Sequence, residues 1–150
     1  MNLRDVPLRQ QDMPTGFAHL RESVREALGG ELIGCSLYEF EPGEQLWPYH
    51  YHWNNEEWLI VVAGRPVLRT PEGERELRPG DLVGFVEGED GAHTLYNRSD
   101  APARVVVFST LQQGSVVYPD SDKVGAGPPW DRLYFRRGDA VDYWEGEAGD

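Results

Sequence analysis

Glycine and proline divide this chain into many short segments. The 17 glycines and 11 prolines are distributed along 150 residues that are otherwise rich in Val, Tyr and Trp. β-Branched and aromatic residues favour a pleated surface, whereas glycine and proline favour the tight turns between strands. The sequence therefore predicts an all-β fold made of many short strands.

The expected strands are short runs of apolar or alternating residues. They span residues 32–40, 46–53, 57–63, 67–70, 75–78, 82–86, 93–97, 103–110, 116–118 and 133–135. Short strands at this spacing indicate a barrel or a sandwich. Near the N-terminus, residues 17–28 could form one face of a helix or an edge strand, and the sequence leaves both possibilities open.

Length, charge and cysteine content limit what the chain can be. A chain of 150 residues is about one domain long, and its single cysteine, Cys35, lies in an apolar run that is expected to be core. The formal net charge of −12 would repel nucleic acid and anionic membranes, so neither is an expected partner. No apolar run of membrane-spanning length and no signal-peptide pattern are present, so we expect a cytoplasmic protein.

Three of the four histidines are the most informative polar residues. His50 and His52 have a spacing that directs both side chains to one face of a strand, and His93 follows later in the chain. A His-x-His pair alone is more often an exposed polar face than a metal site. Together with a nearby carboxylate, however, imidazoles are ligands that divalent first-row metals accept. The sequence therefore predicts a metal site.

The carboxylate comes from the next strand. A turn at residues 53–55 would bring that strand back opposite the histidines. Glu56 and Glu57 point to opposite faces of it, so only one of them can share the site. We select Glu57.

These residues form two motifs that resemble those of the cupin superfamily. The first motif, G-x5-H-x-H-x(3,4)-E-x6-G, is similar to the set Gly43, His50, His52, Glu57 and Gly64. The second, G-x5-P-x-G-x2-H-x3-N, is similar to the set Gly80, Gly88, His93 and Asn97. The resemblance spans roughly residues 33–110, and the x6 spacing before Gly64 selects Glu57 over Glu56.

The match departs from the family pattern at three places. Six residues rather than five separate Gly43 from His50, Val86 replaces a proline, and four residues rather than two separate Gly88 from His93. All three places are in expected turns or strand ends, where changes in length are tolerated. None of them removes an expected ligand.

The resemblance implies a double-stranded β-helix, or jelly-roll barrel, that binds one divalent metal ion. Carried over residue by residue, the implied metal ligands are His50, His52, Glu57 and His93. We expect an N-terminal arm, a barrel core and a C-terminal extension that packs on the barrel or on a partner, at residues 1–31, 32–112 and 113–150. Two loops, at residues 87–93 and 118–125, resemble those of an uncharacterised subgroup of small, single-domain bacterial cupins.

The function implied by such a site is binding of a small molecule. Four protein ligands leave one or two positions open on a five- or six-coordinate metal, as in catalytic sites. The metal could be Zn, Fe, Mn or Ni, because these ligands suit them all. One hypothesis is a metal-dependent isomerase, dioxygenase or lyase that acts on a sugar, keto or carboxylic acid. The alternative is a non-catalytic sensor or carrier, since no dedicated general base stands out.

Other side chains near the motifs could contribute to a pocket. Tyr51 or Trp53 would shape its mouth if either faces the metal. Three hairpin arginines, Arg69, Arg75 and Arg78, could hold an anion, although alternating Arg and Glu usually forms a solvated face. The fourth histidine, His19, is expected to be a surface or packing residue.

The strand that carries Glu57 predicts a covered outer face. With Glu57 inward, Leu59, Val61 and Ala63 face inward too, and the residues that face outward are Trp58, Ile60 and Val62. A strand that is apolar on both faces must be covered twice. The N-terminal segment, residues 133–135 and 141–144, or a second copy could provide the cover, and we expect a homodimer.

Overall fold

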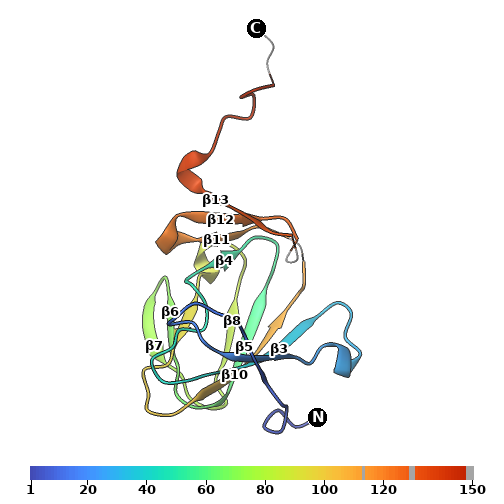
Figure 1. The fold of residues 1–150 in the computed structure, drawn as a ribbon, viewed down its shortest axis with the longest axis vertical. Helices are drawn as coiled ribbons and strands as arrows, with labels where there is room; N and C mark the ends of the chain where they lie inside the picture. The colour runs from blue at the N-terminus through green and yellow to red at the C-terminus, as the bar shows by residue number, and fades with distance from the viewer. Residues whose placement is uncertain (113, 129–130, 148–150) are drawn as a thin grey trace.

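The computed structural model describes residues 1–112, 114–128 and 131–147, and these ranges contain no α-helix. Short antiparallel strands form sheets of six, four and three strands (Figure 1). The six-stranded sheet contains, in order, β1 (Arg9–Gln10), β2 (Leu20–Ser23), β3 (Gly34–Phe40), β10 (Ala103–Ser109), β5 (Glu57–Ala63) and β8 (Leu82–Phe85). The prediction of an all-β jelly-roll barrel is confirmed.

Two smaller sheets complete the barrel. One has the order β13 (Leu133–Arg136), β12 (Lys123–Ala126), β11 (Val116–Tyr118) and β4 (Tyr51–His52). The other has the order β7 (Gly73–Glu76), β6 (Val67–Thr70) and β9 (Thr94–Tyr96). The described ranges contain four single-turn 3₁₀ helices: η1 (Glu26–Leu28), η2 (Glu89–Gly91) and η3 (Pro119–Ser121) connect strands, and η4 (Arg137–Asp139) follows β13. None of the described helices has the length and apolar character needed to cross a membrane.

β10 is the central strand of the large sheet. It pairs along its length with β3 on one side and with β5 on the other. Its continuous apolar sequence follows from this position, because Val105 and Val107 face the barrel interior while Val106 faces the opposite side. The interior core is made by buried side chains from several strands, namely Phe40, Leu46, Leu59, Val61, Leu68, Leu77, Val83, Phe85, Leu95, Ala103, Val105 and Val107.

The alternation along β5 agrees with the expected register except at its end. Leu59 and Val61 are buried in the interior core, and Trp58 is exposed on the other face. Ala63, which we expected to face inward and be covered, is exposed. It is the last residue of β5, where the pairing of β10 with β5 shifts register.

The N-terminal segment covers part of the outer face. Val6 and Val24 pack with Cys35, Leu37 and Val106 in a second buried cluster, with Leu3, Leu8, Val62 and Phe108 around it. The side chain of Arg104 donates hydrogen bonds to the carbonyl oxygens of residues 3, 4 and 6. Residues 17–28 form β2 and η1, so a strand is present and an α-helix is not, but β2 lies between β1 and β3 and not at the edge of the sheet.

Another part of the outer face is not covered by any of the residues that the structure describes. A groove of about 500 Å³ runs across it, and its apolar walls are Ile33, Trp58, Ile60, Leu82 and Phe108. The C-terminal segment does not fill this groove. It leaves β13 and extends away from the barrel (Figure 1), and its apolar side chains, such as Phe135 and Trp144, are exposed.

Three expectations about local structure were wrong. β4 contains two residues instead of the run 46–53, because residues 46–50 contact β9 and its flanks through isolated backbone hydrogen bonds at Leu46 and His50 and through a bond from the Thr94 hydroxyl to the Trp47 carbonyl. β12 (Lys123–Ala126) begins within residues 118–125, which we expected to form a loop. The apolar residues 141–144 form no strand and end in turns.

Candidate metal centre

The two sequence motifs meet through a backbone bridge. The amide of His50 donates to the carbonyl of His93 at 3.2 Å, and the amide of His93 donates to the carbonyl of His50 at 2.9 Å. This isolated antiparallel bridge holds two residues that are far apart in the sequence side by side, and their ring centroids are 4.7 Å apart. The side chains of both motifs therefore start from one rigid pair of backbone positions.

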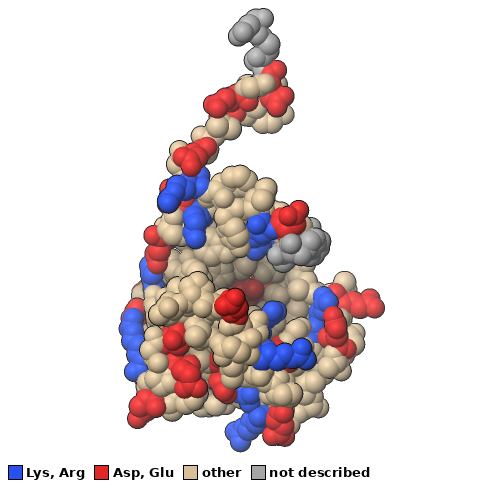
Figure 2. All heavy atoms as spheres, in the orientation of Figure 1, with Lys and Arg blue, Asp and Glu red and all other residues tan. Residues whose placement is uncertain are grey.

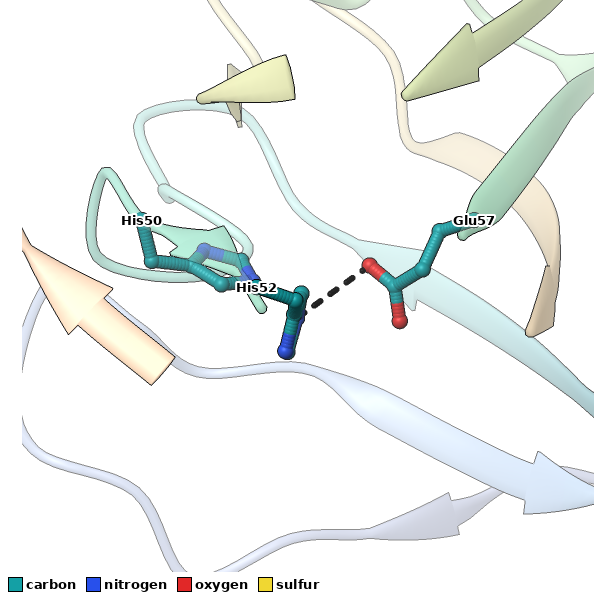
Figure 3. A group of neighbouring side chains, drawn as sticks. All are labelled: His50, His52 and Glu57. Carbon is teal, nitrogen blue, oxygen red and sulfur yellow. Dashed lines mark ion pairs between the residues drawn. The ribbon is translucent and has the colours of Figure 1, made fainter. Parts of the chain in front are cut away.

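His52 and Glu57 complete the cluster from the two sides of a turn. His52 ends β4, Glu57 begins β5, and Asn54 between them has a left-handed φ of 61°. Asparagine tolerates this conformation better than most residues, which suits the tight reversal. The return places the Glu57 carboxylate opposite the His52 ring, with 3.4 Å between Oε2 and Nε2 (Figure 3).

The separations within the cluster are those of groups arranged around a common centre. One ligand atom each from His50, His52 and Glu57 lies within 4.8 Å of the others, and His93 Nε2 is 3.5 Å from Glu57 Oε2. These nitrogen–oxygen distances are longer than a good hydrogen bond. Two ligands that are each about 2.1 Å from one ion lie roughly 3.0–3.4 Å apart. The structure thus brings together all four residues that the sequence nominated, while Glu56 is exposed and lies outside the cluster.

Two backbone carbonyls orient the imidazoles. His50 Nδ1 donates to the carbonyl of Pro48, and His93 Nδ1 donates to the carbonyl of Gly91, both at 2.8 Å. Because a carbonyl oxygen only accepts, each Nδ1 carries the proton and each Nε2 keeps its lone pair. Such second contacts are typical of metal-binding histidines. Gly91 belongs to η2, the turn formed by the longer loop before His93.

Burial and charge determine the protonation of two cluster residues. Burial, with smaller contributions from His93 and His52, lowers the pKa of His50 to about 3, so its ring is neutral at neutral pH. Burial alone would raise the pKa of Glu57, but its interactions with the His52 and His93 rings outweigh burial and hold that pKa below its usual range. The cluster therefore offers a neutral imidazole and an ionised carboxylate, which are the forms that bind metal.

Aromatic rings enclose the cluster on several sides. Phe85 stacks on His93 with centroids 3.6 Å apart, and Trp47 presents its ring edge-on to both His50 and His93 at 6.2 and 6.1 Å. Tyr118 stacks on His50 at 5.9 Å. Phe85 and Tyr118 come from β8 and β11, outside the first motif, and no local pattern predicts that they reach the cluster.

The two aromatic residues expected at the mouth lie elsewhere. Tyr51 is buried in a third cluster with Tyr49, Ala92 and Val117 because it alternates with the histidines and faces the other way. Trp53 is exposed and its ring lies beside Gly88.

A cavity of about 680 Å³ lies beside the cluster. Its wall includes His19, Arg21, Tyr38, Trp47 and Lys123. Trp47 lines the cavity and also contacts the cluster histidines, and Tyr38 contacts Trp47 at 5.1 Å, so the cavity and the metal ligands lie on two sides of the Trp47 ring. The face drawn in Figure 2 is hollowed near its centre, with both acidic and basic side chains in and around the hollow.

None of the three hairpin arginines lines this cavity. Arg69 forms a bidentate pair with Asp120, at 2.6 and 2.9 Å, and Arg78 pairs with Asp81. Arg75 lines a different surface pocket on the hairpin. His19, expected to be a surface or packing residue, is buried against Tyr38 and lines the cavity.

The lowered pKa of His50 predicts how acid affects the metal-free protein. Between about pH 6.5 and pH 3 the unfolded chain binds a proton at His50 that the folded chain does not, so stability decreases as pH falls through this range. Glu57 acts in the same direction below its normal pKa. Urea unfolding in the presence of a chelator at pH 7, 5 and 4 should show this decrease. The His50→Gln variant should show a smaller decrease, and an equal one would contradict the assignment.

Comparisons with known proteins give the family. The sequence profile of the cupin domain matches residues 36–109. A sugar phosphate isomerase of the cupin superfamily from Silicibacter pomeroyi is 25% identical with a TM-score of 0.80, and the match covers 97% of each chain. A candidate sugar phosphate isomerase from Acidithiobacillus ferrooxidans is 24% identical with a TM-score of 0.83, covering 93% of this chain and 91% of that one.

More distant structures share the fold alone. The polyketide cyclase RemF from Streptomyces resistomycificus has a TM-score of 0.62 at 19% identity, covering 75% of this chain and 78% of its own. A comparison with curated proteins found no match. The matched profile and the shared architecture agree with the two motifs, and the chain belongs to the cupin superfamily.

Proposed function

We propose that this protein binds one divalent metal ion and uses it as an enzyme on a small polar molecule, in the class of sugar phosphate isomerases. The observation that carries the proposal is the convergence of His50, His52, Glu57 and His93 with their donor atoms prepared for a metal. His52 and Glu57 keep 19% and 16% of their side-chain surface exposed, so a ligand can approach the ion. An ion held there would supply a Lewis acid that polarises a carbonyl or hydroxyl oxygen.

The chain's own residues have separate tasks in this proposal. Glu57 balances part of the charge of the ion, and the Nδ1 anchors keep His50 and His93 from rotating. Phe85 and Trp47 pack against these rings and exclude water from their sides. The cavity beyond Trp47 provides room for the rest of a small molecule.

The substrate class rests on similarity and on the character of the cavity. The Silicibacter pomeroyi protein, at 25% identity over 97% of both chains, is named as a sugar phosphate isomerase. The cavity combines aromatic rings with polar and basic side chains, which suits a hydroxylated and charged ligand.

A non-catalytic sensor or carrier is the second candidate. Burial raises the pKa of both phenols near the cluster, Tyr38 and Tyr118, so at neutral pH they donate hydrogen bonds but do not act as bases. An isomerase needs a group that accepts a proton, and neither phenol provides one.

Metal content tests the first part of the proposal. Elemental analysis of protein purified without chelator should find about one equivalent of a divalent metal per chain. His50→Ala and His93→Ala should lose most of it, because removing one of four ligands weakens binding strongly. Glu56→Gln is the matched control and should keep its metal. Full metal content in both histidine variants would refute the assigned ligands.

Turnover separates the enzyme from the carrier. The metal-loaded protein is incubated with a panel of aldose and ketose phosphates, and products are followed by mass spectrometry coupled to chromatography that separates isomers. We expect conversion of one compound at many turnovers per chain, and a loss of at least a hundredfold in His52→Ala. Thermal stabilisation by a compound that is never converted would favour the carrier.

We also propose that the protein is a homodimer. The apolar groove around Trp58 and the exposed C-terminal apolar residues are two uncovered surfaces of one chain. A second copy can cover both, because its C-terminal segment extends away from its own barrel (Figure 1).

Light scattering tests this assembly. The parent protein should have twice the chain mass of 17.0 kDa. Trp58→Asp should shift the protein toward monomer, because the variant places a charge in the proposed contact. Leu28→Asp, at another exposed apolar residue, should leave the dimer intact. A parent protein that is monomeric at micromolar concentration would rule the dimer out.

A further inference from the structure

The cavity beside the metal cluster has an unusual charge balance for this chain. The protein as a whole has a formal net charge of −12. Yet the cavity wall contains two cations, Arg21 and Lys123, and a single acid, Asp120. Among the described residues neither cation has a carboxylate within ion-pairing distance. Asp120 is already neutralised by its bidentate pair with Arg69.

Both cations are held in place by contacts that leave their charge available. Arg21 donates to the hydroxyl of Ser36 at 3.0 Å and lies over the ring of Tyr38. Lys123 lies over the ring of Tyr118. A hydroxyl and aromatic faces position a cation without cancelling it. An anion that enters the cavity would therefore find prepared partners.

His19 adds an acceptor to the same wall. Its side chain is 5% exposed, and Nδ1 donates to the carbonyl of Phe17 at 2.9 Å. Nδ1 therefore carries the proton in the neutral ring, and Nε2 keeps a lone pair. Burial lowers the pKa of His19, which favours this neutral form. No hydrogen bond to Nε2 is present among the described residues, so this atom can accept one from a ligand hydroxyl.

We propose that this cavity is the subsite for the anionic end of a hydroxylated small molecule, with Arg21 and Lys123 binding its phosphate or carboxylate and His19 Nε2 accepting from a hydroxyl. The rings of Tyr38 and Trp47 offer apolar faces on which a sugar ring can stack. The volume of about 680 Å³ lies within the range of small-molecule pockets. This subsite rests on the proposed function, because it would bind the part of the substrate that does not touch the metal.

Calorimetric titrations test the subsite with and without the metal. The probes are glucose 6-phosphate, gluconate and glucose, which share a hydroxylated carbon chain and carry a phosphate, a carboxylate and no charge. Protein treated with chelator should bind at least one anionic probe more than tenfold tighter than glucose. The preferred anionic probe identifies the phosphate or the carboxylate as the recognised group. Equal binding of all three, or no binding of either anion, would overturn the proposal.

Charge variants identify the residues. Arg21→Gln and Lys123→Gln should each weaken the preferred anion by roughly tenfold and leave glucose unchanged. Arg75→Gln removes a cation from the hairpin, outside this cavity, and should have no effect. The affinity of the parent protein for the anion should also fall as NaCl rises from about 50 to about 500 mM. Unchanged affinity in both cavity variants would refute the assignment of Arg21 and Lys123.

Two substitutions test His19 without removing its anchor. The amide of His19→Asn can still donate to the Phe17 carbonyl but offers nothing at the position of Nε2, whereas His19→Gln can place an amide oxygen there. Binding should weaken severalfold in the first and recover in part in the second, and equal binding by all three proteins would refute this role. Intact anion binding with no metal-dependent turnover would overturn the proposed enzyme and leave the subsite standing.

Discussion

The pair of backbone hydrogen bonds between His50 and His93 is the contact on which the centre of this structure depends. It joins a segment before β4 to a segment before β9, two parts of the chain that belong to different sheets. Because the bonds are made by the backbone, the relative position of the two imidazoles is determined before their side chains contribute anything. The side-chain anchors to Pro48 and Gly91 then only have to choose the orientation of each ring. A precise ligand geometry requires side chains that start from a rigid backbone and are held in one orientation by hydrogen bonds.

The six-stranded sheet positions the carboxylate of the cluster. β10 lies between β3 and β5, and its two faces contribute to two separate cores, one inside the barrel and one under the N-terminal segment. Glu57 is the first residue of β5 and is paired with Ser109 at the end of β10. The carboxylate of the cluster is thus attached to the best-packed part of the molecule, whereas His52 is on a strand of only two residues. In the proposed centre, Glu57 is therefore attached to a long, well-packed strand, whereas His52 is attached to a short one.

The sequence predicted local features better than spatial neighbours. The two-residue period of β5 assigned Leu59 and Val61 to the interior and Trp58 to the outside, since alternation is a property of the backbone alone. The four clustered residues were recoverable because their spacing matches known motifs. Phe85, Tyr118 and His19 were not, because each reaches its position through sheet pairing that no local pattern encodes. The same reason explains the arginines: Arg69 was noticed on its hairpin, but its partner Asp120 is 51 residues away.

The contact between Arg104 and the first residues of the chain bears on how the protein is made. The guanidinium group of Arg104 reaches the carbonyl oxygens of Leu3, Arg4 and Val6, about a hundred residues earlier. During synthesis these residues leave the ribosome well before β10, yet the strand that holds them does not exist until β10 has emerged. Until β10 forms, the apolar side chain of Val6 stays exposed to water, and the contacts that bury it are among the longest-range in the fold. A segment that is synthesised early is thus among the last to reach its folded position.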